Sequence, residues 1–232
     1  MTPPVFDDAF RKSASEFFRA EFLLCNINVD GLIEFSSEDT STNHFLDLNF
    51  FDDLRAQGAG AEVFLPKTIY IRKCMKLIFG LAANDLRGPC TGKRALIGSP
   101  GVGKSVLFFL MALNKARHTP VVYFRRTSNA KDRSLFFMNA NEDGTVRIVF
   151  TRKLLGSTNS MAILDFLENQ NHFHQNTYYR FVDGPKHGEN TYTFNRDLDY
   201  FCTSGGFPLP KQESLEQDRI WILDPHFPNK WR

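Results

Sequence analysis

The sequence lacks the features that define several classes of protein. No apolar run approaches the roughly 18–20 residues of a membrane-spanning helix, so we expect no membrane partner. The N-terminus carries Asp7 and Asp8 where a signal peptide needs an apolar core, so we expect no secretory route. The four cysteines show no C-x-x-C spacing and no Cys/His pattern, which argues against a zinc site and a disulfide framework. The default expectation is an intracellular globular protein.

The composition predicts one substantial core and an uneven distribution of charge. The 232 residues are 42% hydrophobic and include 24 phenylalanines, which is typical of a heavily aromatic interior. Residues 1–60 hold 4 Lys and Arg against 11 Asp and Glu, whereas residues 61–232 hold 24 against 15. We therefore predict an acidic N-terminal segment at 1–62 and a basic domain at 63–232, divided after the small, flexible stretch Arg55–Glu62.

The basic charge has two interpretations. A basic surface is compatible with nucleic acid as a partner, but no aromatic and basic residues alternate in the manner of a nucleic-acid motif. The simpler interpretation is a solvated face around a site that binds an anion.

A glycine-rich stretch in this basic part carries a specific motif. Residues 94–113 read RALIGSPGVGKSVLFFLMAL, where a short apolar run precedes the loop and a strongly apolar segment follows it. The loop fits G-x-x-x-x-G-K-[ST], the Walker A pattern, at Gly98, Gly103, Lys104 and Ser105. The flanking residues predict a buried strand before the loop and a helix after it. This is the context in which the pattern binds phosphate.

The loop is predicted to bind a nucleoside triphosphate, ATP, together with Mg²⁺. Backbone N–H groups and the helix N-terminus would converge on the phosphates. We expect Lys104, exposed in the loop, to reach the β- and γ-phosphates, and the Ser105 hydroxyl to help hold the metal. The alternative is a glycine-rich turn with a lysine by chance. The predicted nucleotide-binding residues are Gly98, Ser99, Pro100, Gly101, Val102, Gly103, Lys104, Ser105 and Val106.

Helix and strand patterns alternate around the loop. Helix patterns cover 6–25, 67–83, 106–113 and 159–170. Strand patterns cover 27–37 (a pair turning at Asp30-Gly31), 120–124, 134–150 (a hairpin turning at Asp143-Gly144), 177–184 and 197–205. Together they predict an α/β fold of three layers: a P-loop NTPase with a mostly parallel sheet, an inserted β-hairpin and a small acidic N-terminal α+β segment.

A partner carboxylate for the Mg²⁺ shell is expected at the end of a neighbouring apolar strand. Asp183 fits, because it follows the run Tyr178–Val182. The alternative is a turn-forming Asp-Gly pair, which a hairpin explains fully at Asp143-Gly144. We predict Asp183 as a metal ligand with Ser105, and as a catalytic residue with Lys104.

Two further catalytic residues are predicted on the last strand pattern. The sequence spacing leaves room for a further strand between the strand before the loop and the strand that ends at Asp183. Thr203 or Ser204 on this further strand would contact the γ-phosphate or the attacking water. The alternative for both is an ordinary polar residue at a strand end.

The glutamate that many ATPases place directly after the strand aspartate is missing. Gly184 stands there instead. Glu189 could orient the water, although a solvated loop residue is the simpler interpretation. Hydrolysis is therefore expected to be slow or completed by a partner. Unranked candidates for stabilising transition-state charge are Arg125, Arg126 and Arg152, although a surface role is the simpler interpretation for each.

These elements, in order across residues 66–205, resemble one family. It is the P-loop NTPase domain shared by Crinkler effectors of oomycetes and fungi and by trypanosome retrotransposon hot spot proteins. The matching features are Tyr70, Ile71 and Arg72 ahead of the loop, the G-[ST]-P-G-[IV]-G-K-S form of the loop, and the later Asp-Gly pair.

The resemblance implies an ATP-binding domain of the additional-strand class, with Lys104, Ser105 and Asp183 in the roles above. It also implies that Asp-Gly in place of Asp-Glu is normal for the family. Arg72 carries over as a motif residue of unknown task, with packing of its stem against the sheet as the alternative. Such domains are often coupled to nuclease-like or other effector domains, and several act in a host nucleus. The Leu-Phe-Leu-Ala-Lys-like targeting motif of Crinklers is not found, and we expect a short or truncated member.

The leading interpretation is thus a slow ATPase, the NTPase module of an effector. One alternative is a nucleotide-dependent interaction module with little turnover. Another is a P-loop kinase of a small substrate, in which Phe124–Arg133 would imitate an arginine-rich lid. A second copy of the chain or an effector partner could supply missing groups, and an effector role would place the protein in a host cell or host nucleus.

Overall fold

The computed structural model describes residues 5–32, 44–57, 65–84, 94–126, 133–151, 154, 160–170, 178–184, 199–204 and 219–223. Its helices are α1 (Asp8–Phe18), η1 (Asp30–Leu32), η2 (Asn49–Phe51), α3 (Asp52–Ala56), α5 (Lys73–Asn84), α6 (Lys104–Ala116) and α7 (Ser160–Asn169). Its strands are β1 (Phe22–Ile27), β2 (His44–Asp47), β3 (Thr68–Ile71), β4 (Arg94–Gly98), β5 (Val121–Arg126), β6 (Arg133–Ala140), β7 (Val146–Thr151), β8 (Tyr179–Asp183), β9 (Asp199–Ser204) and β10 (Arg219–Leu223). None of these helices is long and apolar enough to cross a membrane.

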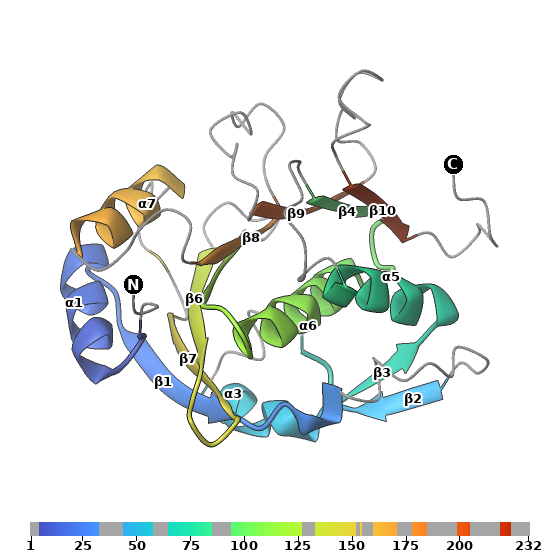
Figure 1. Ribbon diagram of the computed structural model, residues 1–232, viewed down its shortest axis with the longest axis horizontal. Helices are drawn as coiled ribbons and strands as arrows, with labels where there is room; N and C mark the ends of the chain where they lie inside the picture. The colour runs from blue at the N-terminus through green and yellow to red at the C-terminus, as the bar shows by residue number, and fades with distance from the viewer. Residues whose placement is uncertain are drawn as a thin grey trace.

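Eight strands form one mixed sheet in the order β1-β7-β6-β5-β8-β9-β4-β10. The five strands from β5 to β10 in this order pair in parallel, and those from β1 to β5 pair antiparallel. Strand β9 lies between β4 and β8, which confirms the expected intervening strand. Figure 1 shows the sheet curving around α6.

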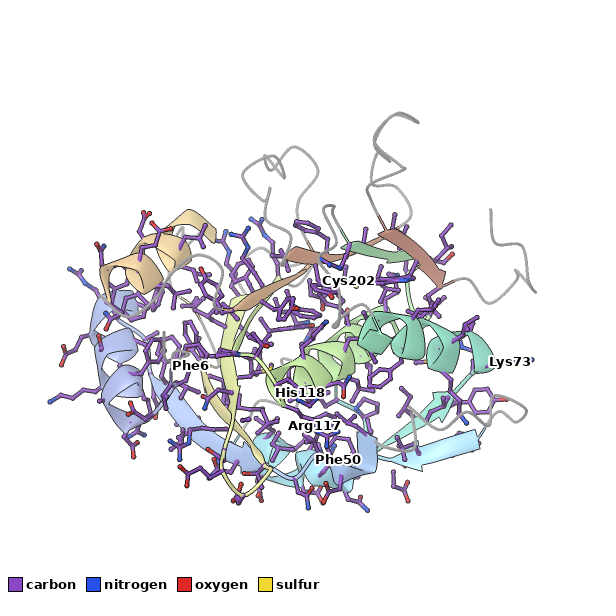
Figure 2. The ribbon with its side chains drawn as sticks, viewed as in Figure 1. Phe6, Phe50, Lys73, Arg117, His118 and Cys202 are labelled. Atoms are coloured by element: carbon purple, nitrogen blue, oxygen red, sulfur yellow. The ribbon has the colours of Figure 1, made fainter. Side chains whose placement is uncertain are left out.

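Helices cover both faces of the sheet, so the predicted three layers are present in the described residues. Residues that alternate along each strand enter two separate cores. Tyr123 and Phe136 pack with α5 and α6 on one face, and their neighbours Val122 and Phe137 pack with α1 and α7 on the other. Figure 2 shows Phe6 on the α1 side and Cys202 on the α6 side.

Helix α6 follows the glycine-rich loop and lies at the centre of the molecule. Every residue from Leu107 to Leu113 is buried, because the helix contacts β4, β5, β6, β8 and β9 on one side and α5 on another. A helix that is apolar all round is typical of such a position. The loop at its N-terminus is therefore held by a rigid element.

The predicted hairpin is confirmed. Strands β6 and β7 pair antiparallel from Leu135 opposite Thr151 to Ala140 opposite Val146, and the chain turns at Asp143-Gly144. The hairpin extends the main sheet by pairing β6 with β5, and β1 from the acidic segment adds the outermost strand beside β7.

Three sequence predictions in the N-terminal half are wrong in part. The first helix ends at Phe18, where Arg19 adopts a left-handed φ of 50°, so Phe22 begins a strand. Asp30 opens a 3-10 helix and not a strand turn. The helix expected over 67–83 begins only at Lys73, because the β-branched and aromatic stretch Thr68–Ile71 pairs with β2 as strand β3.

The predicted division at residues 62 and 63 lies outside the described residues and stays a prediction. The described part of the acidic segment contributes α1 to one helical layer and β1 to the main sheet.

Candidate functional site

The glycine-rich loop joins the end of β4 to the start of α6. Gly101 and Gly103 have φ angles of +78° and +86°, a left-handed conformation that side chains rarely adopt. Gly103 is the N-cap of α6, and no side chain caps the helix there. The backbone N–H groups of the first turn are thus left for a ligand, a geometry that suits an anion.

Lys104 is the first residue of α6, and its position corrects one expectation. The side chain is not exposed: only 9% of the residue's surface is accessible. Its Nζ donates a hydrogen bond to the carbonyl oxygen of Ser99 across the loop. Burial lowers the pKa of Lys104, and the nearby Cys202 and Asp183 oppose this shift. The amine therefore lies inside the curve of the loop.

Ser105 and Asp183, 78 positions apart in the sequence, meet at this loop. The Ser105 hydroxyl donates to Asp183 Oδ1 at 3.2 Å. Ser105 lies in the first turn of α6, and Asp183 ends β8 with only 4% of its surface accessible. The structure thus brings together the two residues predicted as metal ligands, and both offer the oxygen atoms that Mg²⁺ prefers.

The second oxygen of Asp183 is held from the neighbouring strands. Tyr123 on β5 donates its hydroxyl to Oδ2 at 3.0 Å, and Arg125 Nε lies 3.5 Å from the same oxygen. The Cys202 thiol of β9 also forms a hydrogen bond to this carboxyl group. Burial raises the pKa of Asp183, and Arg125, followed by Ser105, Tyr123 and Cys202, opposes that rise.

Neither Tyr123 nor Cys202 was expected at the site from the sequence, and Arg125 was one of three unranked arginines. One signal was available for Tyr123, which carries the one hydroxyl in the buried strand pattern PVVYF. Because a buried tyrosine hydroxyl normally has a hydrogen-bond partner, it pointed to a polar neighbour. Arg125 pairs with the carboxylate of Asp183 along the register of β5 and β8.

Gly184 has a structural reason to be glycine. Its φ is +77°, and a Cβ at this position would lie 2.6 Å from the carbonyl oxygen of Arg126. Its N–H donates to the carbonyl oxygen of Cys202 at 2.9 Å. A glutamate at this position would require a different backbone. Asp143, by contrast, is exposed at a hairpin tip, where its carboxylate accepts from Thr145.

Thr203 and Ser204 lie at the expected end of β9, where they pair with Ile97 and Gly98 at the start of the loop. Their side chains are outside the described part of the structure, so their contact with a phosphate stays a prediction. Arg126 ends β5, half-buried, whereas Glu189 and Arg152 lie outside the described residues, as does most of the lid-like stretch after Arg126.

Arg72 holds the loop from outside the motif. Its guanidinium donates to the carbonyl oxygen of Val102, and its own carbonyl accepts the N–H groups of Met75 and Lys76 at 2.9 and 3.2 Å. The residue thus starts α5 and fixes the peptide just before Gly103. The alternative, in which the Arg72 stem only packs against the sheet, does not account for this hydrogen bond.

We therefore expect the substitution Arg72→Ala to weaken ATP binding about tenfold, because it removes one hydrogen bond from a charged donor to the loop. Calorimetric titration with ATP measures the change. Lys67→Ala, which removes an exposed cation ahead of the same motif, is the control and should keep the parent affinity. Equal affinities for the parent chain and Arg72→Ala would contradict the assignment.

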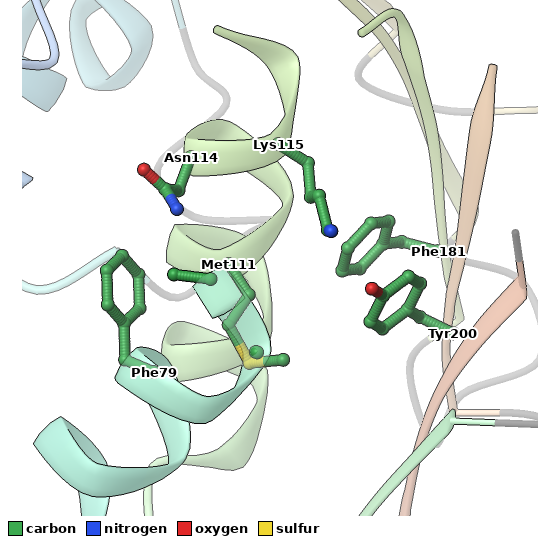
Figure 3. Close-up of a pocket in the computed structure, with 8 residues that line it drawn as sticks. Phe79, Met111, Asn114, Lys115, Phe181 and Tyr200 are labelled. Atoms are coloured by element: carbon green, nitrogen blue, oxygen red, sulfur yellow. The ribbon is translucent and has the colours of Figure 1, made fainter. Parts of the chain in front are cut away.

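A separate gap lies between α5, α6 and the sheet, and it is not part of the site (Figure 3). Its lining includes Met111, Lys115, Phe181 and Tyr200, and none of its lining residues belongs to the loop. Lys115 Nζ lies 4.6 Å from the ring centre of Tyr179 and 5.5 Å from that of Tyr200. The space is too small for a water molecule, so it offers no ligand site.

No protein-family model and no curated protein matches this chain. A solved structure of PCH-2 from C. elegans is similar to it with a TM-score of 0.40 and 13% sequence identity, over 67% of this chain and 43% of the PCH-2 chain. A similarity at this score supports neither a fold family nor a function.

Proposed function

We propose that the chain binds ATP with Mg²⁺ at the loop between β4 and α6. The observation that carries the proposal is the 3.2 Å hydrogen bond between Ser105 and Asp183, because it places a hydroxyl and a carboxylate at the mouth of a glycine-rich loop. A chance glycine-rich turn has no reason to face a buried carboxylate from a strand 78 positions away.

The residues at the loop fit ATP and Mg²⁺ as bound ligands. Ser105 and Asp183 would be the protein ligands of the cation, because their side-chain oxygens lie 3.2 Å apart beside the loop. Mg²⁺ often binds through one or two protein oxygens, completed by phosphate and water. The uncapped N-terminus of α6 faces the phosphates in this arrangement, and Lys104 would exchange its hydrogen bond to Ser99 for one to a phosphate oxygen.

Asp183 supports the same function through its environment. Burial raises its pKa against the opposing effect of Arg125, so a further positive charge beside the carboxyl group would favour its ionised form. Mg²⁺ supplies charge neutralisation and polarises the phosphate when bound. Around it, Ser105 and Asp183 would orient the cation, and Lys104 would fix the phosphate chain.

We further propose that hydrolysis is slow and that the chain is the NTPase module of an effector of the Crinkler and retrotransposon hot spot type. The order in which β9 separates β4 from β8 supports the additional-strand class that this resemblance implies. Gly184 favours low turnover, because its backbone leaves no place for a water-orienting glutamate directly after Asp183. The same observation favours the second candidate, an interaction module that binds ATP and hardly turns it over.

Calorimetric titration of the chain with ATP, in Mg²⁺ and in EDTA, tests the binding proposal. Saturable binding that Mg²⁺ strengthens supports it. No binding under either condition contradicts it, whatever the rate of hydrolysis.

The turnover proposal has its own expected result. The chain should hydrolyse ATP well below the typical enzyme median of about 10 s⁻¹. We expect less than about one turnover per minute, because Gly184 stands where many ATPases place the glutamate that orients the attacking water. Phosphate release measured over a range of protein concentrations checks this, with Lys104→Met as the blank. A fast rate that dilution leaves unchanged would show that the site is already complete.

A further inference from the structure

The hydroxyl of Tyr123 is a polar group in a largely aromatic part of the core. Its ring is fully buried on β5 and packs against Phe108, Phe109, Phe136 and Phe181. A phenylalanine would fill this space equally well. The hydroxyl is therefore not needed for packing, and its partner is Asp183 Oδ2 at 3.0 Å.

The two oxygens of Asp183 have different surroundings. Oδ1 accepts from Ser105 on the loop side, at 3.2 Å. Oδ2 accepts from the Tyr123 hydroxyl at 3.0 Å and lies 3.5 Å from Arg125 Nε, and both residues are on β5. One oxygen is thus presented to the site while the other is fixed behind it.

We propose that Tyr123 is a positioning residue, whose hydroxyl fixes Oδ2 so that Oδ1 stays turned toward Ser105 and the metal. This inference rests on the proposed function, since it assigns Asp183 to the Mg²⁺ shell. A neutral hydroxyl suits the task, because it restrains the carboxylate without adding a second cation that would compete with Mg²⁺. Without it, Oδ2 loses its 3.0 Å hydrogen bond, and the orientation of the carboxylate is less firmly fixed.

The substitution Tyr123→Phe removes that hydroxyl and keeps the ring. The experiment titrates Mg²⁺ into the full chain at a fixed concentration of ATP and follows ATP binding, with a second titration of ATP in EDTA. We expect Tyr123→Phe to need about tenfold more Mg²⁺ for half-saturation, the usual loss for an outer-shell partner of a metal ligand. The affinity for ATP in EDTA should stay at the parent value, a pattern that general loosening of the fold does not produce.

Tyr200→Phe is the matched control. Tyr200 is also fully buried, on β9 in the same core, and its ring stacks on Phe181 at 4.4 Å. This pair lies two register pairs before Asp183 and Cys202 on β8 and β9. Tyr200→Phe should keep the parent Mg²⁺ dependence. A second control repeats the substitution in the Asp183→Asn background, where a residue that acts through Asp183 should add no further effect.

The outcomes separate the two proposals. If the parent chain binds no ATP, the proposed function fails and this inference fails with it. If the parent chain binds Mg²⁺ and ATP but Tyr123→Phe has the same Mg²⁺ midpoint, only the role of Tyr123 is overturned. An equal shift in Tyr200→Phe, or a full effect that persists in Asp183→Asn, would likewise overturn it.

Discussion

Replacing Lys104 by methionine should abolish measurable ATP binding, with a loss of at least about a hundredfold in affinity. The amine lies inside the curve of the loop, where it donates to the Ser99 carbonyl. Its removal takes away a charge-assisted hydrogen bond to the phosphates and the positive charge that balances them. Calorimetric titration with ATP in Mg²⁺ measures the loss.

Methionine is preferred to alanine because the lysine stem is buried at the start of α6. Lys104→Ala leaves a gap beside the loop and can lower stability, whereas Lys104→Met keeps most of the stem. Thermal unfolding of both variants separates the two effects. A folded Lys104→Met protein that binds ATP as tightly as the parent would refute the phosphate-loop assignment.

Local chemistry made some elements predictable from the sequence. The hairpin at Asp143-Gly144 is fixed by its turn and by the apolar arms on either side. The loop from Gly98 to Ser105 needs its glycines for its own backbone, so its conformation follows from neighbouring residues. Asp183 was predicted because an apolar strand runs directly into it.

Elements that depend on distant partners were harder to predict. The stretch Thr68–Ile71 has β-branched and aromatic residues that suit a strand, but the strand forms by pairing with β2, a segment earlier in the chain. Phe22 continues the apolar spacing of α1, yet it pairs with Thr151 of β7, a residue far away in the sequence. No local pattern records either pairing.

The same limit applies to the site. Tyr123, Arg125 and Cys202 meet Asp183 through the register of β5, β8 and β9. Their contacts exist only once three segments far apart in the sequence have paired. The meaning of Gly184 likewise depends on the Arg126 carbonyl of the next strand. The sequence showed that a glutamate was missing, and the structure supplies the steric reason.

Asp183→Asn should weaken Mg²⁺-dependent ATP binding by about a hundredfold, whereas Asp143→Asn should leave it unchanged. Both residues precede a glycine, but Asp183 is buried 3.2 Å from Ser105 and Asp143 is exposed at a hairpin tip. Asparagine keeps the shape of the side chain and one acceptor oxygen, so the change is chiefly the lost negative charge. Loss of a metal ligand should reduce the affinity for the metal at least as much as loss of an outer-shell partner, which reduces it roughly 10–100-fold.

The measurement is ATP binding over a range of Mg²⁺ concentrations, with the same titration in EDTA. Asp183→Asn should differ from the parent chain chiefly when Mg²⁺ is present, because the loop and Lys104 still face the phosphates without it. The thermal stability of Asp183→Asn must also be measured, since the substitution leaves the buried Arg125 next to a neutral group. If Asp183→Asn and Asp143→Asn behave alike, or if Asp143 matters more, Asp183 is not the carboxylate that serves the loop.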